Sequence, residues 1–94
     1  MMKLVAHNSF KKAFRKLIKK NPQLQTKILT ILNLLEDNHF TPSLKSHKLT
    51  GNLDGYWSCS VNYDCRIIFI FSQDENSKED LIVLVDIGSH DEVY

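Results

Sequence analysis

The chain has 94 residues, 43% of them hydrophobic, and a formal net charge of +1. This length suits one globular domain and excludes two. No apolar run approaches the roughly 20 residues that a membrane-spanning helix needs, and the polar start at residues 1–7 does not resemble a signal peptide. We therefore expect a single cytoplasmic domain over residues 1–94 that does not associate with a membrane.

The first predicted elements are a short strand over residues 3–7 and a basic helix after it. Asn8 and Ser9 carry side-chain oxygens that suit the unpaired N–H groups of a helix start. Four apolar residues then follow on one helical face: Phe10, Phe14, Leu17 and Ile18. Five basic residues occupy another face: Lys11, Lys12, Arg15, Lys16 and Lys19. The pattern predicts an amphipathic helix with a positively charged outer side.

The charges are distributed unevenly along the chain. Residues 1–20 contain seven Lys or Arg and no acid, whereas residues 71–94 contain seven acids and one Lys. Such asymmetry favours a polyanionic partner for the basic part. A solvated face of a small domain is the ordinary alternative.

A second helix is predicted over residues 22–37, after the helix-breaking pair Asn21-Pro22. Proline is tolerated at the first position of a helix. The apolar residues of this segment cover more than one stripe: Leu24, Ile28, Leu29, Ile31, Leu32, Leu34 and Leu35. We expect the helix to be nearly buried between a sheet and the first helix, with contact to a partner protein as the alternative.

The remainder of the chain has the pattern of β-strands. Residues 56–62 alternate between apolar and polar side chains, residues 65–71 are rich in β-branched and aromatic residues, and residues 81–87 form a last apolar run. Their short connections, including a polar loop at 72–78, indicate an antiparallel meander. The predicted fold is α+β, with two helices on one face of a small, mainly antiparallel sheet.

Two cysteines, Cys59 and Cys65, lie close together in this strand region. In a reducing cytosol they are expected to be free thiols that act as small strand residues. Because CxxC spacing is absent, a zinc site is not predicted, and no other metal site or cofactor is expected.

Polar residues that suit RNA chemistry are spread over the later strands and the C-terminal segment: Lys45, His47, Lys48, Tyr56, Asp64, Arg66, His90 and Tyr94. Cleavage of RNA by its own 2′-OH needs a base, an acid and a cation for the charged phosphorane. Each residue also has an ordinary explanation, such as a surface ion pair between Asp64 and Arg66. Composition and spacing alone therefore do not establish an enzyme.

Four segments together carry a resemblance to a known family: PSLKSHKLTG at 42–51, GYWS at 55–58, DCRIIF at 64–69 and IGSHDEVY at 87–94. With the helix start SFKK and the Asn21-Pro22 break, they resemble the RelE/ParE superfamily of type II toxins, and in particular its YafQ-like branch. The resemblance covers essentially the whole chain.

The resemblance implies a β-α-α-β-β-β-β toxin that works as a metal-independent endoribonuclease, an mRNA interferase, in the ribosomal A site. Its implied partners are a cognate antitoxin, mRNA and the ribosome, with operator DNA bound only through the antitoxin complex. The implied RNA-binding residues are Lys11, Lys12, Arg15, Lys16, Lys19, Lys45, Lys48 and Tyr56. The basic helix equally suits an acidic segment of the antitoxin.

Position by position, the resemblance also implies catalytic roles. His47 and Asp64 match a catalytic histidine and an active-site aspartate, and either is a candidate for the general base. Arg66 matches a phosphate-binding arginine, His90 a general acid, and Tyr94 a terminal aromatic that stacks on a base. The arginine at position 66 is a feature shared with the YoeB-like branch. The chain departs from the YafQ-like branch where Ser60 stands in place of a second histidine, and from the YoeB-like branch where Cys59 or Ser60 stands in place of a nearby arginine.

Two other functions remain open from the sequence. ParE-like toxins of the same superfamily inhibit DNA gyrase and have no nuclease site, so the pair His47 and His90 argues against them. The departure at Ser60 leaves room for an inert relative that only binds its antitoxin and operator.

Overall fold

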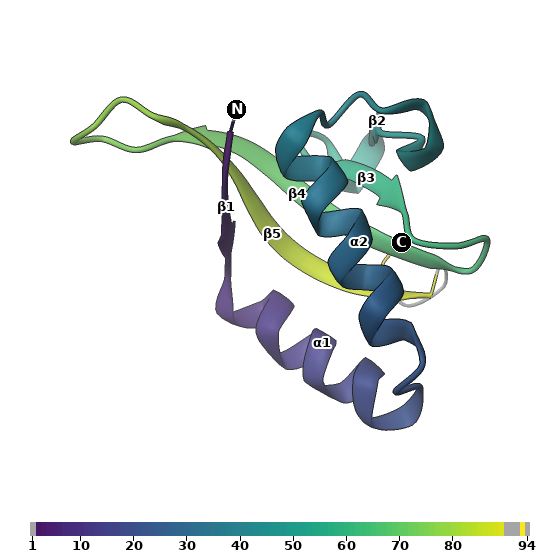
Figure 1. Ribbon diagram of the computed structural model, residues 1–94. Coiled ribbons are helices and arrows are strands. Elements are labelled where there is room, and N and C mark those ends of the chain that lie inside the picture. Colours follow the sequence, from purple (N-terminus) through teal and green to yellow (C-terminus); the bar gives the residue numbers. More distant parts are fainter. Residues whose placement is uncertain (1, 90–92, 94) are drawn as a thin grey trace.

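The computed structural model describes residues 2–89 and 93 (Figure 1). The helices and strands are β1 (Lys3–Ala6), α1 (Asn8–Lys20), α2 (Leu24–Asp37), β2 (His47–Lys48), β3 (Trp57–Ser60), β4 (Cys65–Gln73) and β5 (Asp80–Ser89). Short 3-10 turns lie at Pro42–Leu44 and Gly51–Leu53. Within the described residues, no helix combines the length and the apolar character needed to cross a membrane.

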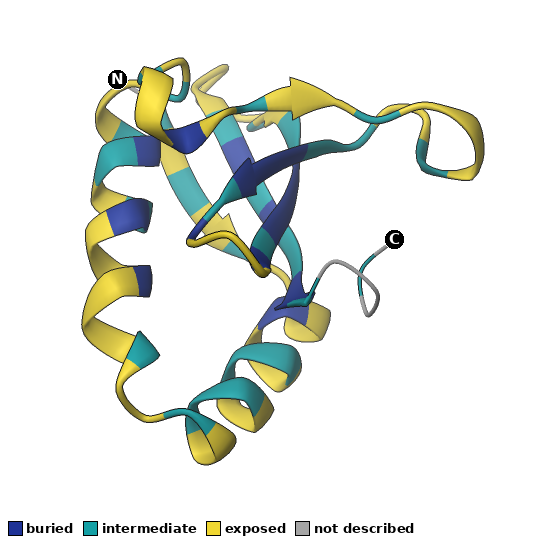
Figure 2. Ribbon diagram, turned by 90° about the vertical axis from the view of Figure 1, so that its right-hand side faces the viewer, coloured by how far each residue is buried: buried dark blue, intermediate teal, exposed yellow. Residues whose placement is uncertain are grey.

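The strands form one sheet in the order β1-β5-β4-β3-β2. β1 runs parallel to β5, and every other neighbouring pair is antiparallel. Both helices pack on one face of this sheet (Figures 1 and 2). Neither helix covers the other face, which is called the open face below, although Ser58 and Ile68 on it are buried. The predicted α+β class and the order β-α-α-β-β-β-β are confirmed.

Helix α1 lies beside β5 and is tied to it at its first turn. His7 N donates to Leu84 O at 2.9 Å, and Ser9 Oγ donates to Val85 O at 2.6 Å. The cap is one residue earlier than expected, because His7 Nδ1 accepts from Ser9 N at 3.2 Å. Phe10 is buried and the other residues of the predicted apolar stripe pack against the core, so the amphipathic pattern is confirmed.

Helix α2 crosses the sheet with only one side buried. Ile28, Ile31 and Leu35 face the core, whereas Leu29 is 50% exposed. Figure 2 shows the outer side of this helix open to solvent. The expectation that α2 is nearly buried between the sheet and α1 is therefore wrong, because α1 packs along β5 and does not cover α2.

The β4–β5 hairpin is longer than its sequence pattern predicts. Strand pairing continues to Gln73 and Asp80, so the expected loop at 72–78 shrinks to the residues between them. Asp74 Oδ1 accepts from Asn76 N at 2.9 Å and from Ser77 N at 3.0 Å, which satisfies the donors of a tight turn. The backbone N–H groups of Ser77 and Asn76 lower the pKa of Asp74.

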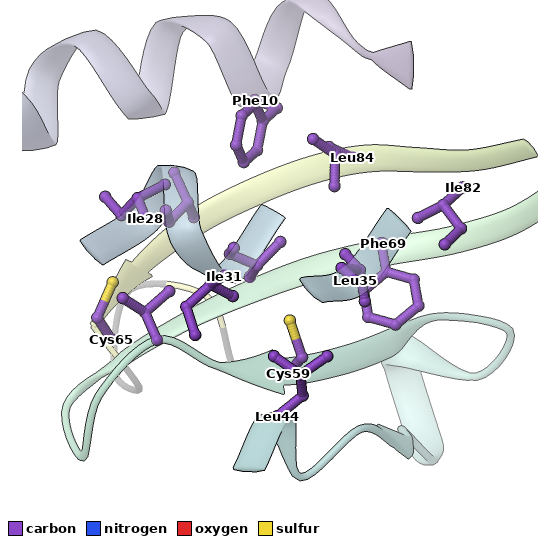
Figure 3. Packing of buried hydrophobic residues seen from close by; sticks show 13 residues of the cluster. Phe10, Ile28, Ile31, Leu35, Leu44, Cys59, Cys65, Phe69, Ile82 and Leu84 are labelled. Carbon is purple, nitrogen blue, oxygen red and sulfur yellow. The ribbon is translucent and has the colours of Figure 1, made fainter. Parts of the chain in front are cut away.

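The core between the sheet and the helices contains both cysteines as free thiols (Figure 3). Cys59 is 0% exposed, and its burial, followed by the nearby Cys65, raises the pKa of its thiol to about 12. Because the thiolate is the reactive form, we expect Cys59 to be protected in the folded protein.

We predict that a maleimide probe labels Cys59 more than about tenfold slower at pH 8 in the native protein than in denaturant. Peptide mapping after timed labelling measures the two rates separately for each cysteine. Equal rates in the two conditions would contradict the burial of this thiol.

Candidate functional site

The open face of the sheet carries polar side chains of the central strands beside the buried Ser58 and Ile68. Residues that pair across strands point to the same face, and His47, Ser58, Ile68 and Asp86 form one such row. The neighbouring row contains Ser60, Arg66 and Gly88. Two residues from the predicted catalytic set, His47 and Arg66, therefore share a face that neither helix covers.

The exposed imidazole of His47 is oriented by a backbone carbonyl. Its Nδ1 lies 3.0 Å from Lys45 O. Because a carbonyl only accepts hydrogen bonds, Nδ1 carries the proton in the neutral ring, and the lone pair lies on Nε2. Lys45 presents this carbonyl from a left-handed backbone conformation with φ of 51°. The geometry leaves Nε2 free to accept a proton from a bound molecule.

The guanidinium of Arg66 is anchored through one of its nitrogens. Nη1 donates to Ser60 Oγ at 3.1 Å, to Cys65 O at 3.2 Å and to Asn62 O. Within residues 2–89 and 93, Nε and Nη2 form no hydrogen bond. The side chain is thus held at one corner, and its remaining N–H donors are available for the oxygens of a phosphate.

Ser60 and Asn62 build the support for this arginine. Ser60 Oγ donates to Asn62 O at 2.9 Å while it accepts from Arg66. The side chain of Asn62 accepts from Asp64 N at 2.9 Å and from Cys65 N at 2.8 Å, which fixes the β3–β4 connection. The residue that departs from the expected family pattern therefore orients the phosphate-binding candidate.

Asp64 lines a different part of the surface from the contacts that hold Arg66. It is exposed in the β3–β4 connection and borders a hollow of about 310 Å³ with Asn21, Leu24 and Ser89. In the described part of the chain, no ion pair joins Asp64 to Arg66. The hollow reaches Ser89, the last residue of β5. The predicted site residues His90 and Tyr94 lie outside the described residues.

The predicted RNA-binding residues are accessible to different extents. Tyr56 is half-buried just before β3, and its carbonyl accepts from Leu49 N at 2.9 Å. Lys48 pairs with Trp57, so its side chain points to the opposite face of the sheet from that of His47. The exposed members of the set are Lys11, Lys12, Arg15, Lys16, Lys19, Lys45 and Lys48.

Asp86 is a residue that sequence reasoning missed. It is half-buried, stands in the same row as His47, and borders a hollow with Lys16 and Lys20. The signal was a lone carboxylate within the apolar run LIVLVDIG. Among residues 2–89 and 93, no group of three or more His, Cys, Asp or Glu is placed to hold a metal ion.

His47 offers a proton acceptor and Arg66 offers free donors that suit a phosphate. The two residues stand two strands apart on the same face, displaced by two residues along the strands. The family model described as "Bacterial toxin of type II toxin-antitoxin system, YafQ" matches residues 2–94. A search of curated proteins found no match.

Several solved structures share this fold over nearly their whole length. YafQ from E. coli strain BL21(DE3) is 20% identical, with a TM-score of 0.78 over 100% of this chain and 99% of that one. A metal-bound toxin from Helicobacter pylori is 26% identical, with a TM-score of 0.71 over 100% of both chains. The toxin in the E. coli DinJ-YafQ toxin-antitoxin complex is 21% identical, with a TM-score of 0.72 over 99% of this chain and 97% of that one.

Proposed function

Because the chain belongs to the YafQ family of bacterial type II toxins, we propose that it is a metal-independent endoribonuclease that cuts mRNA in the ribosomal A site. The 2′-OH attacks the adjacent phosphorus, the 5′-oxygen leaves, and a 2′,3′-cyclic phosphate remains. The observation that carries this proposal is the shared open face of His47 and Arg66, each with reactive atoms that its anchoring contacts leave free.

In this mechanism His47 Nε2 takes the proton of the 2′-OH, since its Nδ1 proton is already held by Lys45 O. The free donors of Arg66 bind the non-bridging oxygens and offset the charge that develops on them. His90 is proposed to protonate the leaving 5′-oxygen, and Tyr94 to stack on a base. Asp64, which lines a hollow with Ser89, is the alternative base.

The cellular setting follows from the same proposal. The exposed lysines and arginine of α1, with Lys45, Lys48 and Tyr56, contact mRNA and ribosomal RNA. A cognate antitoxin binds the toxin and keeps it inactive; a toxin-antitoxin complex is known for the structurally similar E. coli DinJ-YafQ pair. Operator DNA is bound only through that complex, and the toxin acts in the cytoplasm.

The chemistry of cleavage tests the proposal directly. Purified toxin is incubated with programmed ribosomes at constant Mg²⁺, with and without a chelator selective for transition metals. We expect equal cleavage in both, 2′,3′-cyclic phosphate ends, and no cleavage at a nucleotide that carries a single 2′-deoxy substitution. Cleavage that stops with the chelator, or persists at the 2′-deoxy position, would defeat this mechanism.

Removal of the Ser60 hydroxyl that supports Arg66 is expected to lower the cleavage rate moderately. Ser60→Ala deletes the hydroxyl that accepts from Arg66 Nη1, and a hydrogen bond to a charged group of this kind corresponds to about a tenfold change in rate. The maximal cleavage rate should fall while the apparent affinity for ribosomes stays constant. Ser60→Thr keeps the hydroxyl and should retain the rate; equal loss in both variants would contradict a positioning role.

A further inference from the structure

A hollow of about 270 Å³ lies between the second half of α1 and the edge of β5. β1 covers the edge of β5 only as far as Leu84, which pairs with Ala6. Beyond that point α1 takes the place of a neighbouring strand (Figure 1). The polar residues that line the hollow are Lys16, Lys20, Asn21 and Asp86.

These groups combine both signs of charge. Asp86 is half-buried, and its Oδ1 accepts from Ile87 N at 2.8 Å, which fixes the carboxylate and leaves Oδ2 to accept further hydrogen bonds. Lys16 and Lys20 are exposed at the rim, and within the described part of the chain neither forms an ion pair with Asp86. A free phosphate alone would be repelled by the carboxylate, whereas a nucleotide offers N–H donors and a phosphate together.

The hollow adjoins the proposed site of cleavage. Gly88, which lines it, pairs directly with Arg66 across β4 and β5, at about one strand spacing of 4.8 Å. Since glycine has no side chain, nothing from this position stands between the guanidinium and the hollow. An RNA strand whose phosphate binds Arg66 can therefore place a neighbouring nucleotide against α1.

We propose that this hollow is a nucleotide subsite that reads a base bearing an exocyclic amino group. The Asp86 carboxylate accepts from the amino group of adenine, cytosine or guanine, and Lys16 and Lys20 hold the adjoining phosphate. Uracil has no amino group and is discriminated against, because its one N–H donor on that edge is flanked by two carbonyl oxygens that repel the carboxylate. This subsite rests on the proposed ribonuclease function and assigns its base preference.

The test uses RNA that the toxin does not cut. Two 2′-O-methyl hexanucleotides are compared by fluorescence anisotropy: one of adenosines, the other of purine ribosides, which lack only the amino group. We expect wild type to bind the adenosine oligomer about tenfold more tightly, as for one good contact to a base edge. Asp86→Ala should abolish that ratio. Asp80→Ala, an exposed carboxylate on the distant hairpin, should preserve it.

The lysines provide a second, independent readout. Lys16→Gln and Lys20→Gln should weaken binding of both oligomers alike and reduce the log–log salt slope by about 0.7 each, whereas Lys27→Gln on α2 should not. Wild type that fails to distinguish the oligomers, or a ratio that survives Asp86→Ala in a variant with unchanged thermal unfolding, overturns the subsite. Because the probe is uncleavable, an Asp86-dependent ratio in a toxin without nuclease activity would refute the proposed function while leaving the subsite intact.

Discussion

Arg66→Ala is expected to lower the rate of mRNA cleavage about 100- to 1000-fold, the usual cost of removing a preorganised donor from a developing negative charge. The guanidinium is held by three contacts on Nη1, so its free N–H groups need little reorganisation to bind a phosphate. Single-turnover cleavage on programmed ribosomes measures the loss of rate. Bacteria in which Arg66→Ala is induced should also grow, unlike bacteria that express the wild type.

Arg66→Lys provides the matched comparison. Lysine keeps the positive charge and loses the bidentate geometry, so it should recover only part of the rate. Antitoxin binding and thermal unfolding should stay close to wild type in both variants, since Arg66 is only half-buried. Full cleavage by Arg66→Ala would remove this residue from the proposed mechanism.

His47→Ala is expected to slow cleavage about 100- to 10,000-fold, the range for loss of a general base. The imidazole is exposed on the open face with its Nε2 lone pair free, so a small molecule can reach the space that it vacates. Added imidazole should therefore restore part of the rate in the alanine variant, measured in the same single-turnover assay.

A second variant separates chemistry from local structure. His47→Asn retains a donor for Lys45 O and removes the base, so it should be as inactive as the alanine variant. If His47→Asn cleaved at the wild-type rate, the ring would act only as a structural donor. The role of general base would then pass to Asp64.

The elements with strong periodicity were predictable from the sequence. The spacing of apolar residues in α1 predicts which side of the helix packs on the core, and the short loops predict which strands are neighbours. Both predictions are confirmed. The exposure of Leu29 on α2 was not predictable in this way. An apolar residue on a helix favours a buried position, but the sequence does not show which element covers it. Leu29 is exposed because α1 packs along β5 and leaves the outer side of α2 uncovered.

The orientation of Asp86, the candidate residue that the sequence pattern did not indicate, depends on a single irregularity of the sheet. Ile68 pairs with Asp86 and Phe69 with Leu84, so Val85 is an extra residue in β5. Strict alternation from Ile82 and Leu84 would place Asp86 in the core, because a slip of one residue exchanges the two faces. The bulge instead turns Ile87 inward and Asp86 toward the open face.

The anchoring of Arg66 also depends on local structure that the sequence pattern does not show. The sequence places Ser60, Asn62 and Arg66 near one connection, but the hydrogen bonds follow from how the connection folds back on itself. The sequence also suggested an ion pair between Asp64 and Arg66. The connection instead leaves Asp64 at the hollow beside α2 and gives the arginine neutral oxygens.

The most direct test of a ribonuclease site is controlled expression in bacteria of wild type beside His90→Ala, with primer extension on a reporter mRNA. If the toxin is a ribonuclease, we expect the wild type to arrest growth and to produce in-frame cuts in the reporter mRNA. These cuts should be absent with His90→Ala. Arrest without cuts, accompanied by loss of gyrase supercoiling activity, would contradict it and indicate a ParE-like toxin. No arrest with wild type would contradict it as well and indicate an inert relative that binds only its antitoxin.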